Sequence, residues 1–444
     1  MVPVKPSPKP DRWRFAGGLL ACLLAACAQA PRVPGGDAMP MATAAPPPST
    51  LRSVVLVSLD GFRAGDVRAD LAPNLARLAT EGVHADWMTP SYPTLTFPNH
   101  YTLVTGLRPD RHGVVHNTMR DDALGRFRTE DRAAVGDGRW WGGVPIWVTA
   151  ERAGLPTATL SWPGSEAAID GVRPGRWHLF DADRPMDARV DAVLDWLGEP
   201  PATRPRFVTL YFEAIDVASH AHGPDSPQAR AAVREVDAML GRLVDGLGRL
   251  GLWQATDLVI VSDHGMATVP PGQAIAVEDL VPAEVATVVT TGQSVGFEPR
   301  PGREADAARH LLGRHPHHAC WRKSDLPPRW RYGSHPRVPA IVCQMDVGWD
   351  AIRRETLARR PTDHDRGSHG FDPADPSMRT LFVAHGPSFR RGVRLAPFDN
   401  VDVYPLLARL LGVDPEPNDG AARTWGPALA TEPSPGPAPS RSVD

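Results

Sequence analysis

The sequence has few cysteines, no excess of positive charge and no long apolar run. Lys and Arg number 48 and Asp and Glu number 51, which gives a formal net charge of −3. That balance gives no sign of the basic face typical of nucleic-acid-binding proteins, so no specific nucleic-acid partner is expected. The apolar stretch over residues 15–26 is too short for a membrane-spanning helix. With 444 residues the chain can still bury a large core, and it contains no internal repeats.

Residues 1–26 have the composition of an export signal. A basic segment precedes the apolar stretch, and small residues end it. Leu24 to Cys27 resembles the bacterial lipoprotein processing site, which would make Cys27 the lipidated first residue of the mature chain. Ala28 is not the Asp that favours inner-membrane retention, so we expect a periplasmic lipoprotein held at the outer membrane through Cys27. The alternative is a plain secretory signal cleaved near Ala28 to Ala30.

The cysteine count leaves one pair for the folded domain. Of the four cysteines, Cys22 would be removed with the signal and Cys27 would carry lipid. An exported chain lies in an oxidising compartment, where disulfides form and persist. We therefore expect a disulfide between Cys320 and Cys343, with two free buried thiols as the alternative.

The rest of the chain divides by composition. Residues 27–50 are an Ala/Pro-rich tether, and residues 431–444 form a similar tail that we expect to be disordered. Between them, residues 51–430 alternate β-rich runs with helical patterns. This alternation predicts an α/β fold with a mostly parallel central sheet and helices on both faces. Residues from about 270 to 360 are rich in Pro, Arg and His and interrupt this alternation of strands and helices. We interpret them as an insertion that caps the sheet edge.

Individual elements follow from local signals. The apolar runs predict strands near residues 53–59, 157–161, 207–212, 257–262 and 380–384. Helical periodicity and capping residues predict helices near residues 73–82, 146–153, 187–197, 226–250 and 401–411. Pro98 predicts a further helix start, with the helix running through Val104.

Acidic and histidine side chains follow two of the predicted strands. Asp60 comes directly after the first, and Asp263 and His264 come directly after the strand that ends at Ser262. The carboxyl ends of strands in open α/β sheets are where ligands bind. Asp216 and His220 follow a third strand, and their spacing of four residues places both on one side of a helical turn.

A glycine-flanked histidine, His369, completes the predicted metal-binding set, although His364 competes for this role. Mixed oxygen and imidazole ligands suit Zn²⁺, with Mn²⁺ or Co²⁺ as substitutes. His222 is two residues from His220 and points elsewhere, so we expect it to be a wall residue. The His315–His318 run has a metal-like composition, but we interpret it as an exposed loop.

The candidate nucleophile lies at the predicted helix start beside Pro98. Backbone N–H groups at a helix N-terminus favour an anion, and Thr96 would lie there. A threonine hydroxyl becomes a nucleophile once a metal or base removes its proton. On chemistry alone, Thr94 would serve equally well.

Several segments resemble the nucleotide pyrophosphatase/phosphodiesterase family of the alkaline phosphatase superfamily. They are Leu59–Arg63, Thr94–Tyr101, Trp162–Glu166, Asp216–His220, Ser262–Met266 and Ser368–Asp372. The resemblance implies an alkaline phosphatase-like fold and two zinc ions per chain. One zinc would be held by Asp60, Thr96, Asp263 and His264, and the other by Asp216, His220 and His369.

The resemblance also implies an activity. It points to hydrolysis of nucleotide phosphodiester or pyrophosphate bonds through a phosphothreonine at Thr96, with release of nucleoside 5′-monophosphates. Asn117 resembles the asparagine that binds a phosphate oxygen, and Phe97 follows the nucleophile. Phe180 stands where the family usually has a base-stacking tyrosine.

Other functions fit the sequence less well. A phospholipid-directed phosphodiesterase of the same family is the closest alternative. A catalytically inactive binding lipoprotein is the alternative from another class, and the seven intact metal-site positions argue against it. Sulfatases need a Cys or Ser in a different motif, which we do not find. The expected partner is a small phosphodiester substrate such as a nucleotide, and nothing in the sequence indicates an oligomeric state.

Overall fold

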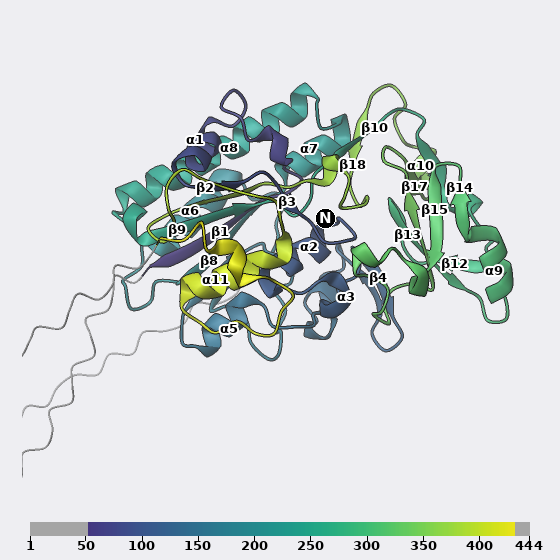
Figure 1. Ribbon diagram of the computed structural model, residues 1–444, viewed down its shortest axis with the longest axis horizontal. Coiled ribbons are helices and arrows are strands. Elements are labelled where there is room, and N and C mark those ends of the chain that lie inside the picture. Colours follow the sequence, from purple (N-terminus) through teal and green to yellow (C-terminus); the bar gives the residue numbers. More distant parts are fainter. Residues whose placement is uncertain (1–51, 431–444) are drawn as a thin grey trace, which may run out of the picture. The chain divides into compact units, whose positions relative to one another are not determined.

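The computed structural model describes residues 52–430 and has an eight-stranded mixed sheet at its centre (Figure 1). The predicted signal, Cys27, the tether and the tail lie outside the described residues. In spatial order the strands are β20 (Val393–Leu395), β2 (Val83–Ala85), β19 (Phe382–His385), β9 (Thr256–Val261), β1 (Ser53–Leu59), β8 (Phe207–Phe212), β6 (Thr157–Leu160) and β7 (Arg176–His178).

Most neighbours in this sheet are parallel. β1 lies between β8 and β9 and runs parallel to both, so the carboxyl ends of all three strands meet at one edge. β19 is the exception, because it runs antiparallel to β9 and to β2. The predicted α/β fold with a mostly parallel sheet is therefore confirmed. The central strands are buried along their whole length, as expected for parallel strands covered on both faces.

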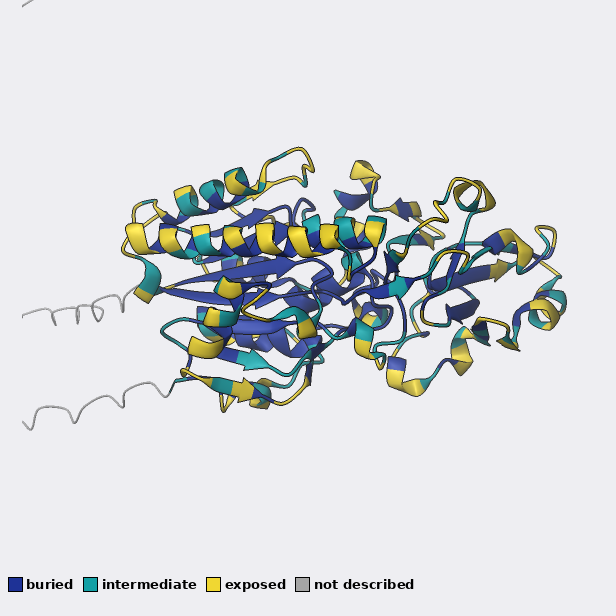
Figure 2. Cartoon of the chain, turned by 90° about the horizontal axis from the view of Figure 1, so that it is seen from above, coloured by how far each residue is buried: buried dark blue, intermediate teal, exposed yellow. Residues whose placement is uncertain are grey.

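Helices cover both faces of the sheet. One face packs against α2 (Thr96–Thr105), α5 (Ile146–Arg152) and α11 (Val403–Leu411), and the other against α1 (Pro73–Glu81), α6 (Met186–Leu197) and α8 (Pro227–Arg249). Val54 and Leu56 of β1 point to the first group, whereas Val55 and Val57 point to the second. Figure 2 shows α8 as the long helix with its buried side toward the sheet and its exposed side toward solvent.

The helix that carries the candidate nucleophile begins earlier than predicted. α2 starts at Thr96, two residues before Pro98, and its preceding residue Leu95 is extended. Proline is tolerated in the first turn of a helix because the N–H groups there have no partner within the helix. Thr96 is consequently the first residue of α2, with its backbone N–H at the helix N-terminus.

A second, five-stranded antiparallel sheet lies in the right-hand part of Figure 1. Its strands in order are β12 (Ala286–Val288), β13 (Ser294–Pro299), β16 (Ile341–Met345), β15 (His318–Arg322) and β14 (Gly313–His315). α9 (Glu304–Leu311) packs on it through Ala307 and Leu311. Cys320 and Cys343 face each other across β15 and β16 and form a disulfide.

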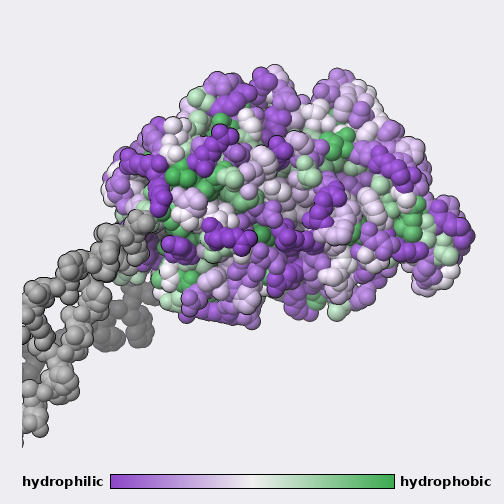
Figure 3. All heavy atoms as spheres, in the orientation of Figure 1, coloured by the Kyte–Doolittle hydropathy of each residue, from purple (hydrophilic) through white to green (hydrophobic). Residues whose placement is uncertain are grey.

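Shorter elements connect these parts. They are α3 (Pro109–His112), α4 (Arg132–Val135), α7 (Ala214–His222), α10 (Arg354–Leu357), β3 (Met88–Thr89), β4 (Thr118–Asp121), β5 (Gly125–Arg128), β10 (Ala267–Val269), β11 (Ala274–Ala276), β17 (Asp350–Ile352), β18 (Arg366–Ser368) and β21 (Phe398–Asp399). Within residues 52–430, no helix is long and apolar enough to cross a membrane. On the face in Figure 3, hydrophobic residues form small patches among hydrophilic ones.

Candidate metal centre and active site

The candidate site lies at the carboxyl ends of β1, β8 and β9. Asp60 follows β1, Asp216 lies in α7 directly after β8, and Asp263 and His264 follow β9. The parallel arrangement of the three strands brings these side chains to one edge of the sheet. The hydroxyl of Tyr211, at the end of β8, donates a hydrogen bond of 2.5 Å to Asp60 Oδ2.

Four of the predicted residues form a first group around the His264 imidazole. His264 Nε2 lies 3.4 Å from Asp60 Oδ1 and 3.0 Å from Asp263 Oδ2. The same nitrogen lies 3.2 Å from Thr96 Oγ1. The hydroxyl proposed as the nucleophile therefore lies next to the imidazole nitrogen that both carboxylates approach.

A second group adjoins the first. His220 Nε2 lies 3.4 Å from Asp216 Oδ1, and His369 Nε2 lies 3.6 Å from the same oxygen. The His369 ring stacks on the His264 ring with 3.5 Å between their centroids. Donor atoms of Asp216, His264 and His369 all lie within 4.8 Å of one another. The two groups are thus continuous, with His264 between them.

The donor atoms fit bound cations. Asp60 Oδ1, Asp216 Oδ1 and Asp263 Oδ2 are buried and have no hydrogen-bond partner among the described residues. Leaving a buried carboxylate oxygen without a donor or a cation is costly. All three oxygens point into the two histidine groups, so one pair of divalent ions would satisfy them together. Oxygen and imidazole donors are the set that Zn²⁺ and Mn²⁺ accept.

The pKa shifts show the same crowding of negative charge. Burial raises the pKa of Asp60 well above its usual range, and the carboxylates of Asp263 and Asp216 raise it further. Burial also acts to raise the pKa of Asp263, but the imidazoles of His264 and His100 hold it well below its usual range. For His369, burial and then the neighbouring imidazoles lower the pKa. Its ring therefore stays neutral, which is the state that binds a metal.

Thr96 and Thr94 have different surroundings. Thr94 is fully buried, and its hydroxyl donates to the Phe371 carbonyl and accepts from the Gly370 N–H, both at 2.9 Å. Thr96 instead lines an open cavity of about 410 Å³. The geometry therefore favours Thr96 over Thr94 as the nucleophile.

The cavity next to Thr96 contains the other predicted substrate-binding residues. Phe97, Asn117 and Phe180 all line it. Asn117 Oδ1 accepts a hydrogen bond of 3.0 Å from the Phe97 N–H, which fixes the orientation of the amide and leaves its N–H₂ group free to donate. The Phe180 ring lies edge-on to the Tyr211 ring, with 6.0 Å between centroids.

Several residues of the site were not assigned roles from the sequence. His100 binds Ser58 Oγ through Nε2 at 2.8 Å, and its Nδ1 lies 3.3 Å from Asp263 Oδ2. Glu166 and Arg132 line the cavity, and their charged groups lie 3.5 Å apart. His100 and Glu166 belong to segments that carry the family resemblance, whereas Tyr211 lies in a strand buried on both faces, where no alternation distinguishes it.

The remaining histidine candidates lie elsewhere. His364 contacts Asp363 and the Ala221 carbonyl, whereas His369 contacts Asp216. His222 lies beside His364, with 5.9 Å between ring centroids. His315 and His318 stack on each other in the β14–β15 hairpin, and the cysteine closest to them, Cys320, is already bonded to Cys343.

Side chains in and next to the five-stranded sheet hold the His369 loop by hydrogen bonds. Gln344 of β16 donates through Nε2 to the Gly370 carbonyl at 3.4 Å. Gln293 donates to Ser368 Oγ and to Asp350 through the same amide nitrogen. The residues on both sides of His369 are therefore held by side chains from the 290–350 region.

Comparisons with known proteins show what this chain is similar to. A family model described as type I phosphodiesterase/nucleotide pyrophosphatase matches residues 54–372. Human ectonucleotide pyrophosphatase/phosphodiesterase family member 7 is 36% identical over 393 residues, which cover 85% of this chain and 84% of that protein. Mouse family member 3 is 34% identical over 397 residues, or 87% of this chain and 45% of the relative, so the chain spans less than half of that protein's length. The structure of an inactive murine family member 5 in complex with AMP matches with a TM-score of 0.80 and 31% identity, over 85% of this chain and 100% of that chain.

Proposed function

The chain belongs to the type I phosphodiesterase/nucleotide pyrophosphatase family and is a phosphodiesterase, and from this premise we propose a specific reaction. The enzyme hydrolyses nucleotide phosphodiester and pyrophosphate bonds with zinc and releases nucleoside 5′-monophosphates. The observation that carries the proposal is the position of the Thr96 hydroxyl, 3.2 Å from His264 Nε2 and at the wall of the substrate-sized cavity. The AMP bound by the murine relative supports a nucleotide in that cavity.

The reaction proceeds in two displacements. Thr96 Oγ1 attacks the phosphorus, the bond to the leaving oxygen breaks, and a phosphothreonine forms. Water then attacks the phosphothreonine, which frees the 5′-monophosphate and restores the hydroxyl. Two zinc ions, one on Asp60, Asp263, His264 and Thr96 and the other on Asp216, His220 and His369, would supply the positive charge that favours the Thr96 alkoxide and the leaving oxygen.

Residues of the chain itself stabilise the charge on the phosphate. The N–H₂ group of Asn117 is oriented by the Phe97 N–H and is free to donate to a non-bridging oxygen. The backbone N–H of Thr96, at the first position of α2, favours negative charge at the same place. Both donors lie at the start of α2, the helix that carries the reacting hydroxyl.

The nucleophile is tested by Thr96→Ala. We expect turnover to fall by at least about three orders of magnitude, because the variant loses the only group that forms the intermediate. The domain should stay folded, since Thr96 contributes no buried packing that α2 needs. Acid quenching of the wild type during turnover should trap a phosphopeptide with the label on Thr96, localised by tandem mass spectrometry.

Thr94→Ser is the matched control, because it keeps a hydroxyl beside Phe371. A label on Thr94 would contradict the assignment. Metal removal gives an independent check: the enzyme should lose activity after rigorous chelation and regain it with zinc. Full activity without metal would refute the mechanism.

Phe180 tests the substrate class. A nucleobase would stack on Phe180, and Phe97 lines the same cavity. Base–aromatic stacking contributes about 1–3 kcal/mol per base, so Phe180→Ala should raise KM for dinucleotides and nucleoside triphosphates by about tenfold or more. A small chromogenic diester should be nearly unaffected.

The phospholipid-directed alternative has one observation in its favour. Leu179 and Val217, beside Phe180 and Asp216, are apolar and about half exposed, at 49% and 58%. Equal losses on both substrate types in Phe180→Ala, or a preference for choline-headed lysophospholipids over nucleotides, would move the assignment to this alternative.

We also propose a location and a domain plan. The protein is an exported lipoprotein of the periplasm that is tethered to the outer membrane through Cys27 and residues 28–50, and residues 270–360 act as a capping insertion. The contacts of Gln344 and Gln293 with the His369 loop support the second part, since this region holds one of the ligand loops.

A further inference from the structure

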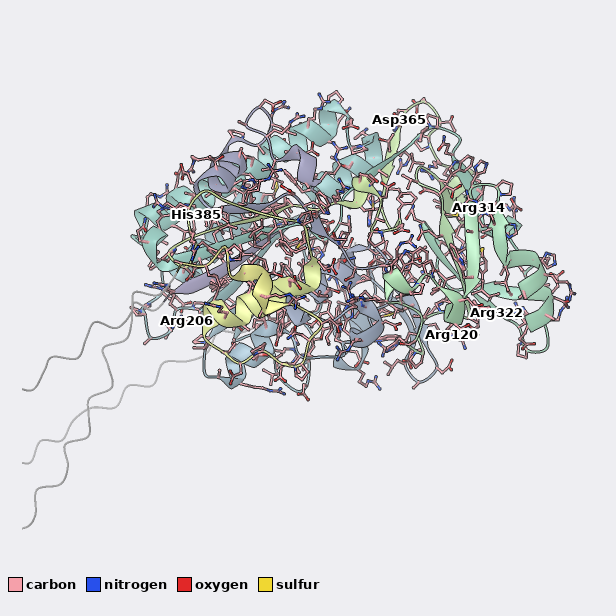
Figure 4. All side chains as sticks on the ribbon, in the orientation of Figure 1. Arg120, Arg206, Arg314, Arg322, Asp365 and His385 are labelled. Atoms are coloured by element: carbon pink, nitrogen blue, oxygen red, sulfur yellow. A yellow bond between two sulfur atoms is a disulfide. The ribbon has the colours of Figure 1, made fainter. Side chains whose placement is uncertain are left out.

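A charged cleft lies between the β4–β5 hairpin and the five-stranded sheet. Two hollows of about 390 and 750 Å³ adjoin there and share Arg120, Thr287 and Val289 in their walls. The hairpin forms one wall, and residues of β12, β13 and the Lys323 region form the other. Figure 4 labels Arg120 on the hairpin side and Arg322, which precedes Lys323, on the side of the sheet. The proposed metal ligands line neither hollow.

The cleft holds more positive than negative charge. Arg337 is paired with Asp121, which leaves four cations (Arg120, Arg126, Arg300 and Lys323) against two acids, Asp122 and Glu298. Among the described residues, Arg126 and Arg300 have no carboxylate within 4 Å, and Arg120 reaches only the exposed Asp122, at 3.7 Å. Lys323 Nζ donates to the Val338 carbonyl. Arg300 Nε likewise donates to the Ala283 carbonyl, at 2.6 Å. All four side chains keep further N–H groups that can donate to an anion.

The arrangement of the hairpin arginines is unfavourable without an anion. Arg120 and Arg126 lie directly opposite each other across β4 and β5, and both are exposed. Like charges at directly opposed positions destabilise a hairpin. A bound phosphate chain would supply the missing negative charge, and guanidinium groups bind phosphate oxygens through two parallel hydrogen bonds.

The hairpin begins and ends at the catalytic cavity. Asn117 immediately precedes β4, Thr129 and Glu130 immediately follow β5, and all three line the cavity that contains Thr96. Because a strand rises about 3.3 Å per residue, Arg120 is about 10 Å along the hairpin from Asn117. Arg128, which pairs with Thr118, lies between them on the exposed side. The arginines thus continue from the phosphate-binding end of the cavity toward the cleft.

We propose that this cleft binds the phosphate chain of a leaving group that extends beyond the scissile bond. The inference rests on the proposed release of nucleoside 5′-monophosphates, in which the released nucleoside occupies the cavity beside Phe180. The rest of the substrate then extends on the other side of the attacked phosphorus. Oligonucleotides and dinucleoside polyphosphates share this feature, and contacts to phosphates alone carry no sequence preference.

The test uses substrates that place the same nucleotide in the cavity and differ in the leaving group. Nitrophenyl thymidine 5′-monophosphate has a small leaving group, hexathymidylate with a free 3′ end has a phosphodiester chain, and dithymidine pentaphosphate has a polyphosphate. The double variant Arg120→Gln/Arg126→Gln should lose about tenfold in kcat/KM on a chain substrate and keep its kcat/KM on the nitrophenyl ester.

A binding measurement tests the affinity of the cleft for phosphates without turnover. Thr96→Ala protein should bind 5′-labelled hexathymidylate or dithymidine pentaphosphate with an affinity that falls with salt. Adding the two glutamine substitutions should reduce the slope of log affinity against log salt by about one. The control is Arg234→Gln/Arg249→Gln, which removes the same charge from two exposed arginines of α8. Within residues 52–430 these two also have no carboxylate within 4 Å.

Each outcome decides the proposal. A loss confined to the hairpin variant supports it, and the substrate that shows the loss identifies the diester chain or the polyphosphate as the ligand. Equal losses of kcat/KM and affinity in the α8 control would show that the effect comes from the lower net charge of the protein. That result would overturn the proposal that the cleft binds phosphates. No change on either chain substrate would overturn it as well. Failure of the wild type to hydrolyse the nitrophenyl ester would instead count against the proposed function, because that ester does not reach the cleft.

Discussion

At the scale of single residues, Gly61 determines how closely two candidate ligands approach. It follows Asp60 with a φ of +70°, a conformation that favours glycine. A Cβ at this position would lie 3.2 Å from Asp216 Cα and 3.3 Å from Asp216 Oδ1. The absence of a side chain therefore lets the turn after β1 pack against α7, which brings Asp60 and Asp216 into one site.

We expect Gly61→Ala to lower kcat by at least about tenfold, because the added methyl group displaces Asp216. The backbone strain should also lower the free energy of unfolding by about 1–2 kcal/mol. Gly251→Ala is the matched control, since Gly251 has a φ of +69° and a Cβ added there would have no atom of the described chain within 4 Å. Denaturant unfolding should show similar losses for both variants, and hydrolysis of a chromogenic diester should show a loss for Gly61→Ala only. Equal activity in the two variants would contradict the argument.

Single residues also show which parts of the site could be predicted from the sequence and which could not. Motif and spacing selected Thr96, Asp216 and His369, and the structure brings the hydroxyl, carboxylate and imidazole together. The chemistry of the side chains alone did not separate Thr94 from Thr96, and the family resemblance favoured Thr96. The structure adds a physical reason, because the Thr94 hydroxyl is already bonded to Phe371 and Gly370. The bond from Tyr211 to Asp60 connects residues 151 positions apart, and no local pattern encodes such a distance.

At the scale of elements, the strands and helices with strong local signals were predicted within a few residues. The predicted helix at 226–250 is α8, where Ser226 accepts a hydrogen bond from the Ala229 N–H and Pro227 opens the helix. The sheet order was not predicted, because the pairing of β1 with β8 and β9 depends on contacts between segments about 150 to 200 residues apart. The antiparallel direction of β19 was missed for the same reason.

The segment from α3 to β4 contains two buried histidines that link stability to pH. His112 Nδ1 accepts from the Val114 N–H, and His116 Nδ1 accepts from the Thr118 N–H, so each ring is held in its neutral form. Burial lowers the pKa of His112 to about 3 and the pKa of His116 to about 4. Both values lie below the usual pKa of about 6.5, so the unfolded chain binds protons first as the pH falls.

We therefore expect the contribution of these two groups to the free energy of unfolding to be constant above pH 6.5. Below pH 6.5 it should fall by about 1.4 kcal/mol per pH unit for each histidine, until the folded pKa is reached. The measurement compares the metal-free wild type with His116→Gln by denaturant unfolding between pH 7 and pH 5. The difference between the two pH slopes gives the contribution of the His116 ring. The control is His310→Gln, which replaces an exposed histidine of α9. An identical pH slope in the wild type and His116→Gln would contradict the argument.

At the scale of the whole molecule, the described chain begins and ends at the side of the sheet opposite the site. Arg52 donates to Ser388 Oγ at 3.0 Å, and the Ala430 N–H donates to the Ser388 carbonyl at 2.9 Å, so both ends meet at one residue. β1 starts at Ser53, and Asp60 follows its other end. At about 3.3 Å per residue, this strand separates the two ends from the metal ligands by about 20 Å.

This geometry makes a prediction about the proposed lipid anchor. A lipid at Cys27 would connect to the described domain at residue 52, at the amino end of β1 and about 20 Å from the metal ligands. Cys27→Ser should therefore abolish lipid labelling and release the protein from membranes, while kcat and KM for a soluble nucleotide diester stay within about twofold of the wild type. Fractionation of the exported protein and kinetics of the released form measure both parts. Continued membrane attachment of the variant would refute lipidation at Cys27. A large loss of activity on the soluble substrate would contradict the separation of the anchor from the site.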